Sequence, residues 1–142
     1  MIYLENTSLA SQLRVLEFLS WKLPGSIIVI WNYPDVKRQN IPIFGSKLFN
    51  QGFMPATEYC DGTVLRHSQP RVATPSILFY LNHFEKELRE SVDSVCLYPK
   101  DQCDFLACTI GHEGMSLVRN HDCLSLLITK GFNASLKAPS WW

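Results

Sequence analysis

One apolar segment, SIIVIWNY at residues 26–33, constrains the fold of this chain more than any other. It is rich in β-branched and aromatic residues and lacks the polar–apolar alternation of a strand with one face in water. This pattern favours a strand covered on both faces. We therefore expect this segment to lie at the centre of a sheet.

Two segments have the period of amphipathic helices. In residues 8–23, Thr7 or Ser8 can act as the N-cap and Pro24-Gly25 ends the helix. In residues 124–131, LSLLITKG, Gly131 is the stop, and Asn120 or His121 precedes the first turn. The predicted apolar stripes are Leu9, Leu13, Leu16 and Leu23 in the first helix, and Leu124, Leu127 and Ile128 in the second.

The helix predicted from Thr74 to Val92 is the clearest element. Thr74 supplies an N-cap oxygen, and Pro75 sits at the first helical position, where its missing N–H costs nothing. The outer face, EKELRE, is predicted to be solvated, with Glu85 and Arg89 paired one turn apart. The predicted apolar stripe consists of Ile77, Leu81, Phe84, Leu88 and Val92.

Shorter segments predict the remaining strands. SVCLYP, DFLACTI and MSLVR, at residues 94–99, 104–110 and 115–119, indicate a meander, and the glycines around residues 112–113 favour a tight hairpin. Between residues 41 and 61 no period is clear; we expect a short helix over residues 46–50 and a strand near residues 56–59. The turn Asp61-Gly62 then lets residues 63–67, TVLRH, pair back as a hairpin.

The order of these elements predicts an α+β fold, in which about three helices pack on a mostly antiparallel sheet. The chain has 142 residues, 46% of them apolar, with no internal repeat or low-complexity linker. This length and composition indicate a single globular domain over residues 1–142.

The charges and the hydropathy exclude two classes of partner. Thirteen basic and thirteen acidic side chains cancel, so the chain lacks the positive excess that nucleic-acid binding requires. No apolar run reaches the roughly 18 residues that span a bilayer, and the start, MIYLENTS, has no basic signal-peptide region. We therefore expect a cytoplasmic protein with no nucleic-acid or membrane partner.

The cysteines and histidines predict no metal or cofactor site. Five cysteines without a CxxC pair, at positions 60, 96, 103, 108 and 123, are interpreted as buried thiols. The nucleotide-binding motifs GxxxxGK[ST] and GxGxxG and the hydrolase motif GxSxG are absent. His112-Glu113 begins the metalloprotease pattern HExxH, but Ser116 stands where the second histidine is required. A site from His112, His121 and Asp122 is not expected, because an extended segment separates them.

Two alternatives to a simple binding domain stay open. In the first, Cys60 beside the turn is a nucleophile and His67 across the hairpin is its base, which would make the protein a small thiol-dependent hydrolase. In the second, the C-terminal SWW mediates a homodimer, and the protein is a structural or regulatory subunit.

The last third of the chain, from GMSLVR through SLLITKG to APSWW, is similar to the immunity proteins of bacterial toxin systems, including contact-dependent growth inhibition. This resemblance implies a small single domain that neutralises a cognate toxin by covering it. It assigns no functional residue to this chain. Immunity proteins against basic nucleases are often acidic, and the zero net charge departs from that pattern.

Loop aromatic and acidic residues are the predicted contacts for such a partner, since aromatic anchors and charged rims are typical of interfaces. For Trp31 we also weigh packing in the core. The predicted partner-binding residues are Trp31, Tyr33, Asp35, Glu58, Asp61 and Glu113.

Overall fold

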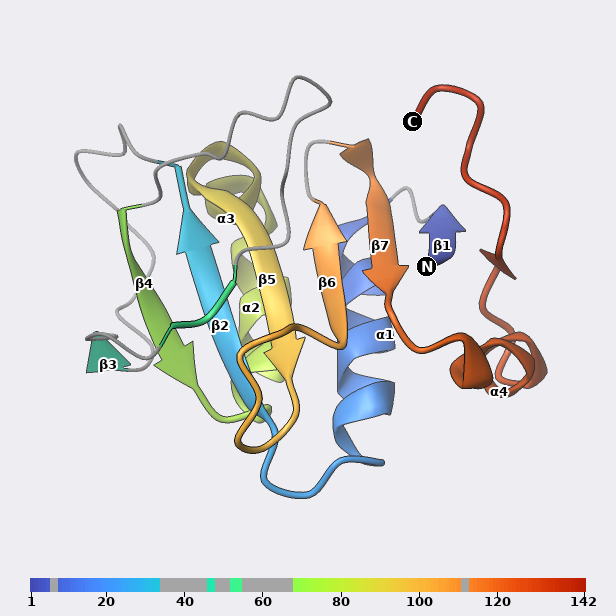
Figure 1. Cartoon of the computed structure of the whole chain (residues 1–142). Coiled ribbons are helices and arrows are strands. Elements are labelled where there is room, and N and C mark those ends of the chain that lie inside the picture. The colour runs from blue at the N-terminus through green and yellow to red at the C-terminus, as the bar shows by residue number, and fades with distance from the viewer. Residues whose placement is uncertain (6–7, 34–45, 48–51, 55–67, 111–112) are drawn as a thin grey trace.

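An antiparallel sheet with helices packed on one face forms the centre of the molecule (Figure 1). The computed structural model describes residues 1–5, 8–33, 46–47, 52–54, 68–110 and 113–142. Within them, eight strands are ordered β3-β4-β2-β5-β6-β7-β1-β8, and every neighbouring pair is antiparallel. The prediction of an α+β fold is confirmed.

The strands are unequal in length, and the longest lie inside the sheet. They are β1 (Ile2–Glu5), β2 (Ile27–Asn32), β3 (Ser46–Lys47), β4 (Ser68–Ala73), β5 (Val92–Tyr98), β6 (Ala107–Ile110), β7 (Met115–Val118) and β8 (Ala134–Ser135). The helical elements are α1 (Leu9–Ser20), α2 (Ile77–Leu81), the 3-10 turn η1 (Asn82–Phe84), α3 (Glu85–Ser91), the 3-10 turn η3 (His121–Cys123) and α4 (Leu124–Thr129).

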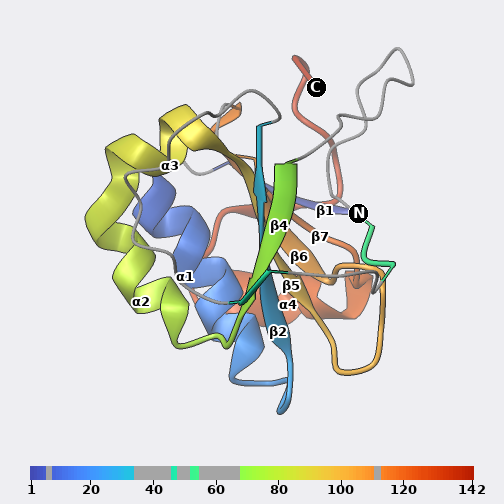
Figure 2. The ribbon, with the colours of Figure 1, turned by 90° about the vertical axis from the view of Figure 1, so that its left-hand side faces the viewer.

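Strand β2 lies between β4 and β5 and is covered on both faces, as its sequence predicts. Ile28 and Ile30 belong to the core between the sheet and the helices, whereas Val29 and Trp31 belong to a second core on the opposite face. Figure 2 shows α1, α2 and α3 together on one side of the sheet. The second core contains Cys96, Tyr98, Phe105, Cys108, Ile110, Met115 and Leu117 in addition to the two β2 side chains.

Helix α1 starts where the sequence predicts and ends earlier. Ser8 is its N-cap, and the Ser8 hydroxyl oxygen accepts a hydrogen bond from the Ser11 N–H at 3.2 Å. The helix ends at Ser20, one turn before Pro24, so Leu23 lies beyond the helix and is half-buried.

The continuous helix predicted from Thr74 to Val92 is wrong. The segment is divided into α2, η1 and α3, and between η1 and α3 the backbone of Phe84 leaves the helical region, at φ −120° and ψ 35°. Val92 is the first residue of β5, and every residue of this strand is buried. The strand is favoured at Val92 because β-branched side chains suit a central strand better than a helix. Thr74 is not the N-cap: that position is held by Ser76, which makes no side-chain cap bond, and the Thr74 hydroxyl contacts the Ser76 hydroxyl at 2.8 Å.

The predicted meander is confirmed, since β5, β6 and β7 are consecutive neighbours in the sheet. Gly114, at φ +63°, lies in the turn between β6 and β7, where glycine adopts positive φ without strain. The short helix predicted over residues 46–50 is wrong at Ser46–Lys47, which form β3. The strand near residues 56–59 and the hairpin at residues 61–67 lie outside the described residues.

Helix α4 ends as predicted, with Gly131 at φ +83° and the Phe132 N–H donating to the Leu127 carbonyl at 3.0 Å. Leu127 is buried and Leu124 half-buried, but Ile128 is 53% exposed, so its place in the apolar stripe is wrong. The helix is short and packs against the edge of the sheet near β8, which leaves part of its circumference in water.

The cysteines divide by environment. Cys96 and Cys108 are directly opposed on β5 and β6 and are buried, as predicted. Cys103 is exposed on the β5–β6 loop and Cys123 is half-buried, so the prediction is wrong for these two. Cys60 lies outside the described residues. None of the helices in the described residues has the length and apolar character needed to cross a bilayer.

Candidate functional site

The three predicted partner-binding residues that the structure describes, Trp31, Tyr33 and Glu113, differ in exposure. Trp31 is 6% exposed, and its indole N–H donates to the Tyr98 hydroxyl at 3.1 Å, so its ring belongs to the core. Tyr33 is half-buried, and its backbone N–H donates to the Ser91 carbonyl at 3.1 Å. Glu113 is exposed in the turn between β6 and β7.

The remaining predicted site residues belong to the part of the chain that the structure does not describe. These are the partner-binding candidates Asp35, Glu58 and Asp61. They also include Cys60, the nucleophile of the alternative hydrolase, and His67, its base.

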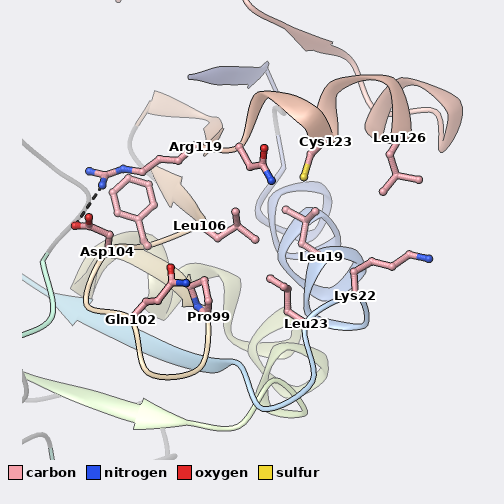
Figure 3. Close-up of a pocket in the computed structure, with 12 residues that line it drawn as sticks. Leu19, Lys22, Leu23, Pro99, Gln102, Asp104, Leu106, Arg119, Cys123 and Leu126 are labelled. Carbon is pink, nitrogen blue, oxygen red and sulfur yellow. Dashed lines mark ion pairs between the residues drawn. The ribbon is translucent and has the colours of Figure 1, made fainter.

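A cleft of about 460 Å³ lies between three elements that are distant in sequence (Figure 3). The end of α1, the β5–β6 loop and the segment from the end of β7 into α4 form its walls. Its lining residues are Leu19, Lys22, Leu23, Pro99, Gln102, Asp104, Phe105, Leu106, Arg119, Asn120, Cys123 and Leu126.

Arg119 is the most firmly positioned charged group of this cleft. Its backbone N–H donates to the Leu106 carbonyl at 2.8 Å, and the Leu106 N–H donates to the Leu97 carbonyl at 2.8 Å, so both are tied to β5. The guanidinium carbon lies 4.1 Å from the centre of the buried Phe105 ring, within the range of a cation–π contact. Its Nη1 atom is 3.4 Å from an Asp104 carboxylate oxygen. Because both side chains are substantially exposed, this ion pair orients the groups more than it stabilises the fold.

The thiol of Cys123 also lines the cleft, but it is poorly suited to nucleophilic chemistry. Burial raises the pKa of Cys123, and the neighbouring Asp122 carboxylate raises it further. The thiol therefore stays protonated at neutral pH, whereas a nucleophilic cysteine needs a lowered pKa. Asn120 caps η3 by accepting from the Asp122 N–H at 3.0 Å, as its predicted place before the first turn implies.

Metal ligands do not converge in the described part of the chain. No group of three or more His, Cys, Asp or Glu side chains there is close enough to hold an ion. The ring Nε2 of His121 is in contact with the N-terminal amine of Met1. His112 lies outside the described residues, so its relation to His121 and Asp122 stays a prediction.

A second surface lies on the outer side of α2, and we call Phe79, Tyr80 and His83 the α2 aromatic surface. Phe79 is 65% exposed and Tyr80 is 53% exposed. The Phe79 ring meets the Tyr80 ring edge-on at 5.7 Å and the His83 ring at 5.9 Å. Ile77, Leu78 and Leu81 are buried, and they fix α2 to the core while these rings face outward.

The sequence contains a signal for this surface outside the predicted apolar stripe. Phe79 and Tyr80 fall between the stripe positions of an amphipathic segment, where polar residues are the rule. Two adjacent aromatic residues on the outer face of a helix are therefore informative in themselves.

No protein-family model, curated protein or solved structure matches this chain.

Proposed function

We propose that this protein is a bacterial immunity protein of the cytoplasm, which binds a cognate toxin domain and neutralises it through a protein–protein interface centred on the α2 aromatic surface. The observation that carries this proposal is the exposure of Phe79 and Tyr80, at 65% and 53%, on a helix whose opposite side is buried. Large aromatic side chains that remain in water on an ordered element are typical of binding sites.

The rigidity of α2 supports this assignment. Its buried side chains Leu78 and Leu81 are 1% and 0% exposed, so the helix is held in place before any partner arrives. The two aromatic rings are already packed against each other. Binding would then order few additional groups, which lowers the entropic cost of forming the interface.

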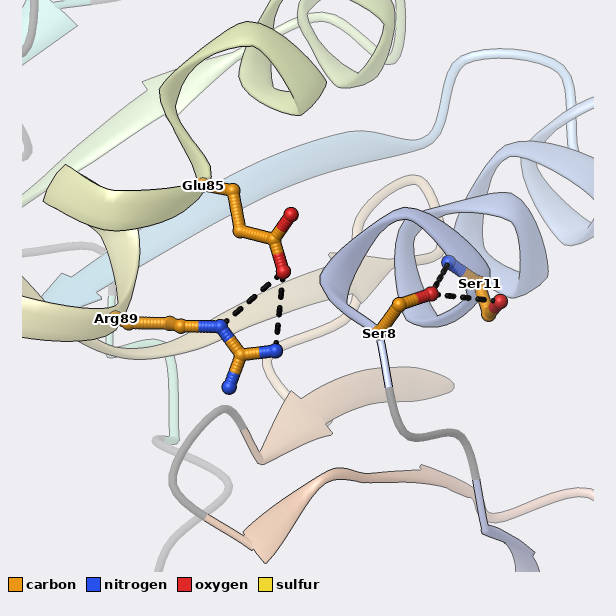
Figure 4. A network of polar contacts seen from close by, with 4 residues as sticks. All are labelled: Ser8, Ser11, Glu85 and Arg89. Atoms are coloured by element: carbon orange, nitrogen blue, oxygen red, sulfur yellow. Dashed lines mark hydrogen bonds and ion pairs between the residues drawn. The ribbon is translucent and has the colours of Figure 1, made fainter.

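The charges around this surface fit a polar rim. Helix α3 follows directly and exposes Glu85, Lys86, Arg89 and Glu90. Glu85 accepts hydrogen bonds from Arg89 at 3.0 and 3.2 Å, as predicted (Figure 4). Because both signs alternate here, the rim favours a partner of mixed charge over a strongly basic nuclease.

Binding to the toxin domain encoded beside the gene tests the proposal. We expect purified protein to form a stoichiometric complex with that domain and to abolish its activity. The double substitution Phe79→Ala and Tyr80→Ala should weaken the complex by about 2 kcal/mol or more, measured by titration calorimetry.

The matched control is Trp142→Ala, which removes an aromatic side chain that is also about half exposed, at 50%, but lies outside α2. Thermal unfolding of each variant separates lost binding from lost folding. A toxin domain that stays active and uncaptured in the presence of the protein would refute the proposal, and equal effects of the α2 and Trp142 variants would move the interface away from α2.

A further inference from the structure

We propose that the cleft between α1, the β5–β6 loop and α4 binds a small amphipathic molecule with a carboxylate head and an apolar body. This site is separate from the α2 aromatic surface and goes beyond the proposed toxin neutralisation. Its volume of about 460 Å³ is in the range typical of small-molecule sites.

The cleft has a polar end and an apolar end (Figure 3). Arg119, Asp104 and Gln102 lie together on one side of the view, whereas Leu19, Leu23 and Leu126 lie on the other. Leu23 and Leu126 are only half-buried, so their side chains keep apolar surface that a ligand would cover. This division matches a molecule that is charged at one end and apolar along the rest.

The polar end favours an anion. Arg119 contributes a positive charge whose backbone is tied to β5 and whose guanidinium rests on Phe105. Its contact with Asp104 is 3.4 Å long, beyond the usual range of a charge-assisted hydrogen bond, and Asp104 is 69% exposed. A ligand carboxylate can therefore take a shorter, bidentate contact with the guanidinium.

The remaining charge in the cleft is also positive. Lys22 lies at the apolar side with its ammonium group directed away from the leucines. With Arg119 and Lys22 against Asp104, the lining carries an excess of one positive charge. Lysine of this kind covers apolar surface with its methylene chain and keeps its charge in water.

Titration calorimetry with decanoate and with decan-1-ol tests the head group. We expect decanoate to bind the intact protein, and decan-1-ol, which has the same chain without the carboxylate, to bind more weakly. Arg119→Gln should weaken decanoate binding about tenfold and leave decan-1-ol binding unchanged. The matched control is Arg89→Gln, because Arg89 also pairs with one acid on the surface at nearly the same exposure.

A second variant guards against a folding defect in Arg119→Gln. Asp104→Asn removes the carboxylate that competes for Arg119, so it should tighten decanoate binding, a gain that misfolding cannot produce.

Alkylation tests where decanoate binds: saturating decanoate should slow the reaction of Cys123 with iodoacetamide, followed on the Cys123 peptide by mass spectrometry. The proposal is overturned if decanoate does not bind, if Arg119→Gln binds it as the intact protein does, or if Cys123 reacts at the same rate with and without it.

Discussion

At the scale of single residues, Tyr98 is a fully buried side chain of the second core with a polar hydroxyl group. Its hydroxyl donates to the Met54 carbonyl at 2.6 Å and accepts from the Trp31 indole N–H at 3.1 Å. The Phe53 ring packs edge-on against it at 4.7 Å. Burial raises the pKa of Tyr98 well above its ordinary value, and the neighbouring Cys96 raises it further.

This raised pKa predicts a loss of stability in alkali. Below about pH 10 tyrosine is protonated in both states, so the contribution of Tyr98 is fully present. Above that pH the unfolded chain loses the proton and the folded protein keeps it, so the free energy of unfolding falls by about 1.4 kcal/mol per pH unit. Tyr98→Phe should remove this part of the slope. Urea denaturation between pH 8 and 11 measures both.

The same substitution has a cost at lower pH. It leaves the Trp31 N–H and the Met54 carbonyl without the hydroxyl, and we expect a loss of about 1 to 3 kcal/mol at pH 8. Burial and the neighbouring Cys96 also raise the pKa of Cys108. Cys108 contributes to the alkaline slope in the intact protein and in the variant alike, so the difference between the two slopes reports Tyr98. Equal slopes for Tyr98→Phe and the intact protein would contradict the assignment.

How far the site could be predicted also depends on single residues. The alternative of core packing for Trp31 is what the structure shows, because its neighbours in β2 are apolar on both faces. The cleft was not predictable, since Leu19, Asp104 and Arg119 come from three separate elements and are joined only by tertiary packing. The pattern of residues within one segment gives no information about contacts between distant segments.

At the scale of elements, the two helices that begin after a serine or threonine differ in their caps. Ser8 caps α1 through the Ser11 N–H, whereas neither Thr74 nor Ser76 makes a side-chain cap bond to α2. Both sequences offered a suitable residue. What differs is the backbone: Ser8 is extended, at φ −115° and ψ 143°, as a capping residue requires, and Ser76 is already helical.

We expect Ser8→Ala to destabilise the protein by about 1 kcal/mol, because an amide of the first turn loses its acceptor. Thr74→Ala, as the matched control, should change the free energy of unfolding by less than about 0.5 kcal/mol. Urea denaturation at neutral pH measures both. Similar losses in the two variants would mean that the Ser8 cap contributes nothing specific.

The division of residues 74–92 shows where periodicity fails. The spacing of Ile77, Leu81 and Leu88 is helical, and all three are buried, so the stripe was informative. Yet the same spacing continues to Val92, where the chain is already in β5. A short apolar run does not distinguish a buried strand from a helix, and the pairing of β5 with β2 and β6 decides it.

At the scale of the whole molecule, the sheet is wider than the sequence predicts. The interior strand β2 and the meander of β5, β6 and β7 were predictable, because their apolar segments are long or joined by short turns. Strands β1, β4 and β8 were not. Strand β1 pairs with β7 and β8 near the other end of the chain, and no local signal encodes a pairing across that separation.

The position of β1 inside the sheet gives a prediction. Leu4 is fully buried in the core beneath the helices, so Leu4→Ala should cost about 2 to 5 kcal/mol, as in any closely packed core. Leu136→Ala, at a position 52% exposed, should cost less than about 0.5 kcal/mol. Urea denaturation compares the two. A cost for Leu4→Ala as small as that for Leu136→Ala would show that β1 is not an integral strand.

The pairing of β1 also bears on how the nascent chain folds. Residues 2–5 are synthesised before the strands that they pair with, because residues 115–118 and 134–135 follow more than a hundred residues later. Until those partners are synthesised, the apolar side chains of Ile2 and Leu4 have no neighbouring strand, and α1 cannot pack against the complete sheet. The last step of assembly therefore waits for the C-terminal part of the chain, and slowing translation should lengthen the time that these residues are accessible to chaperones.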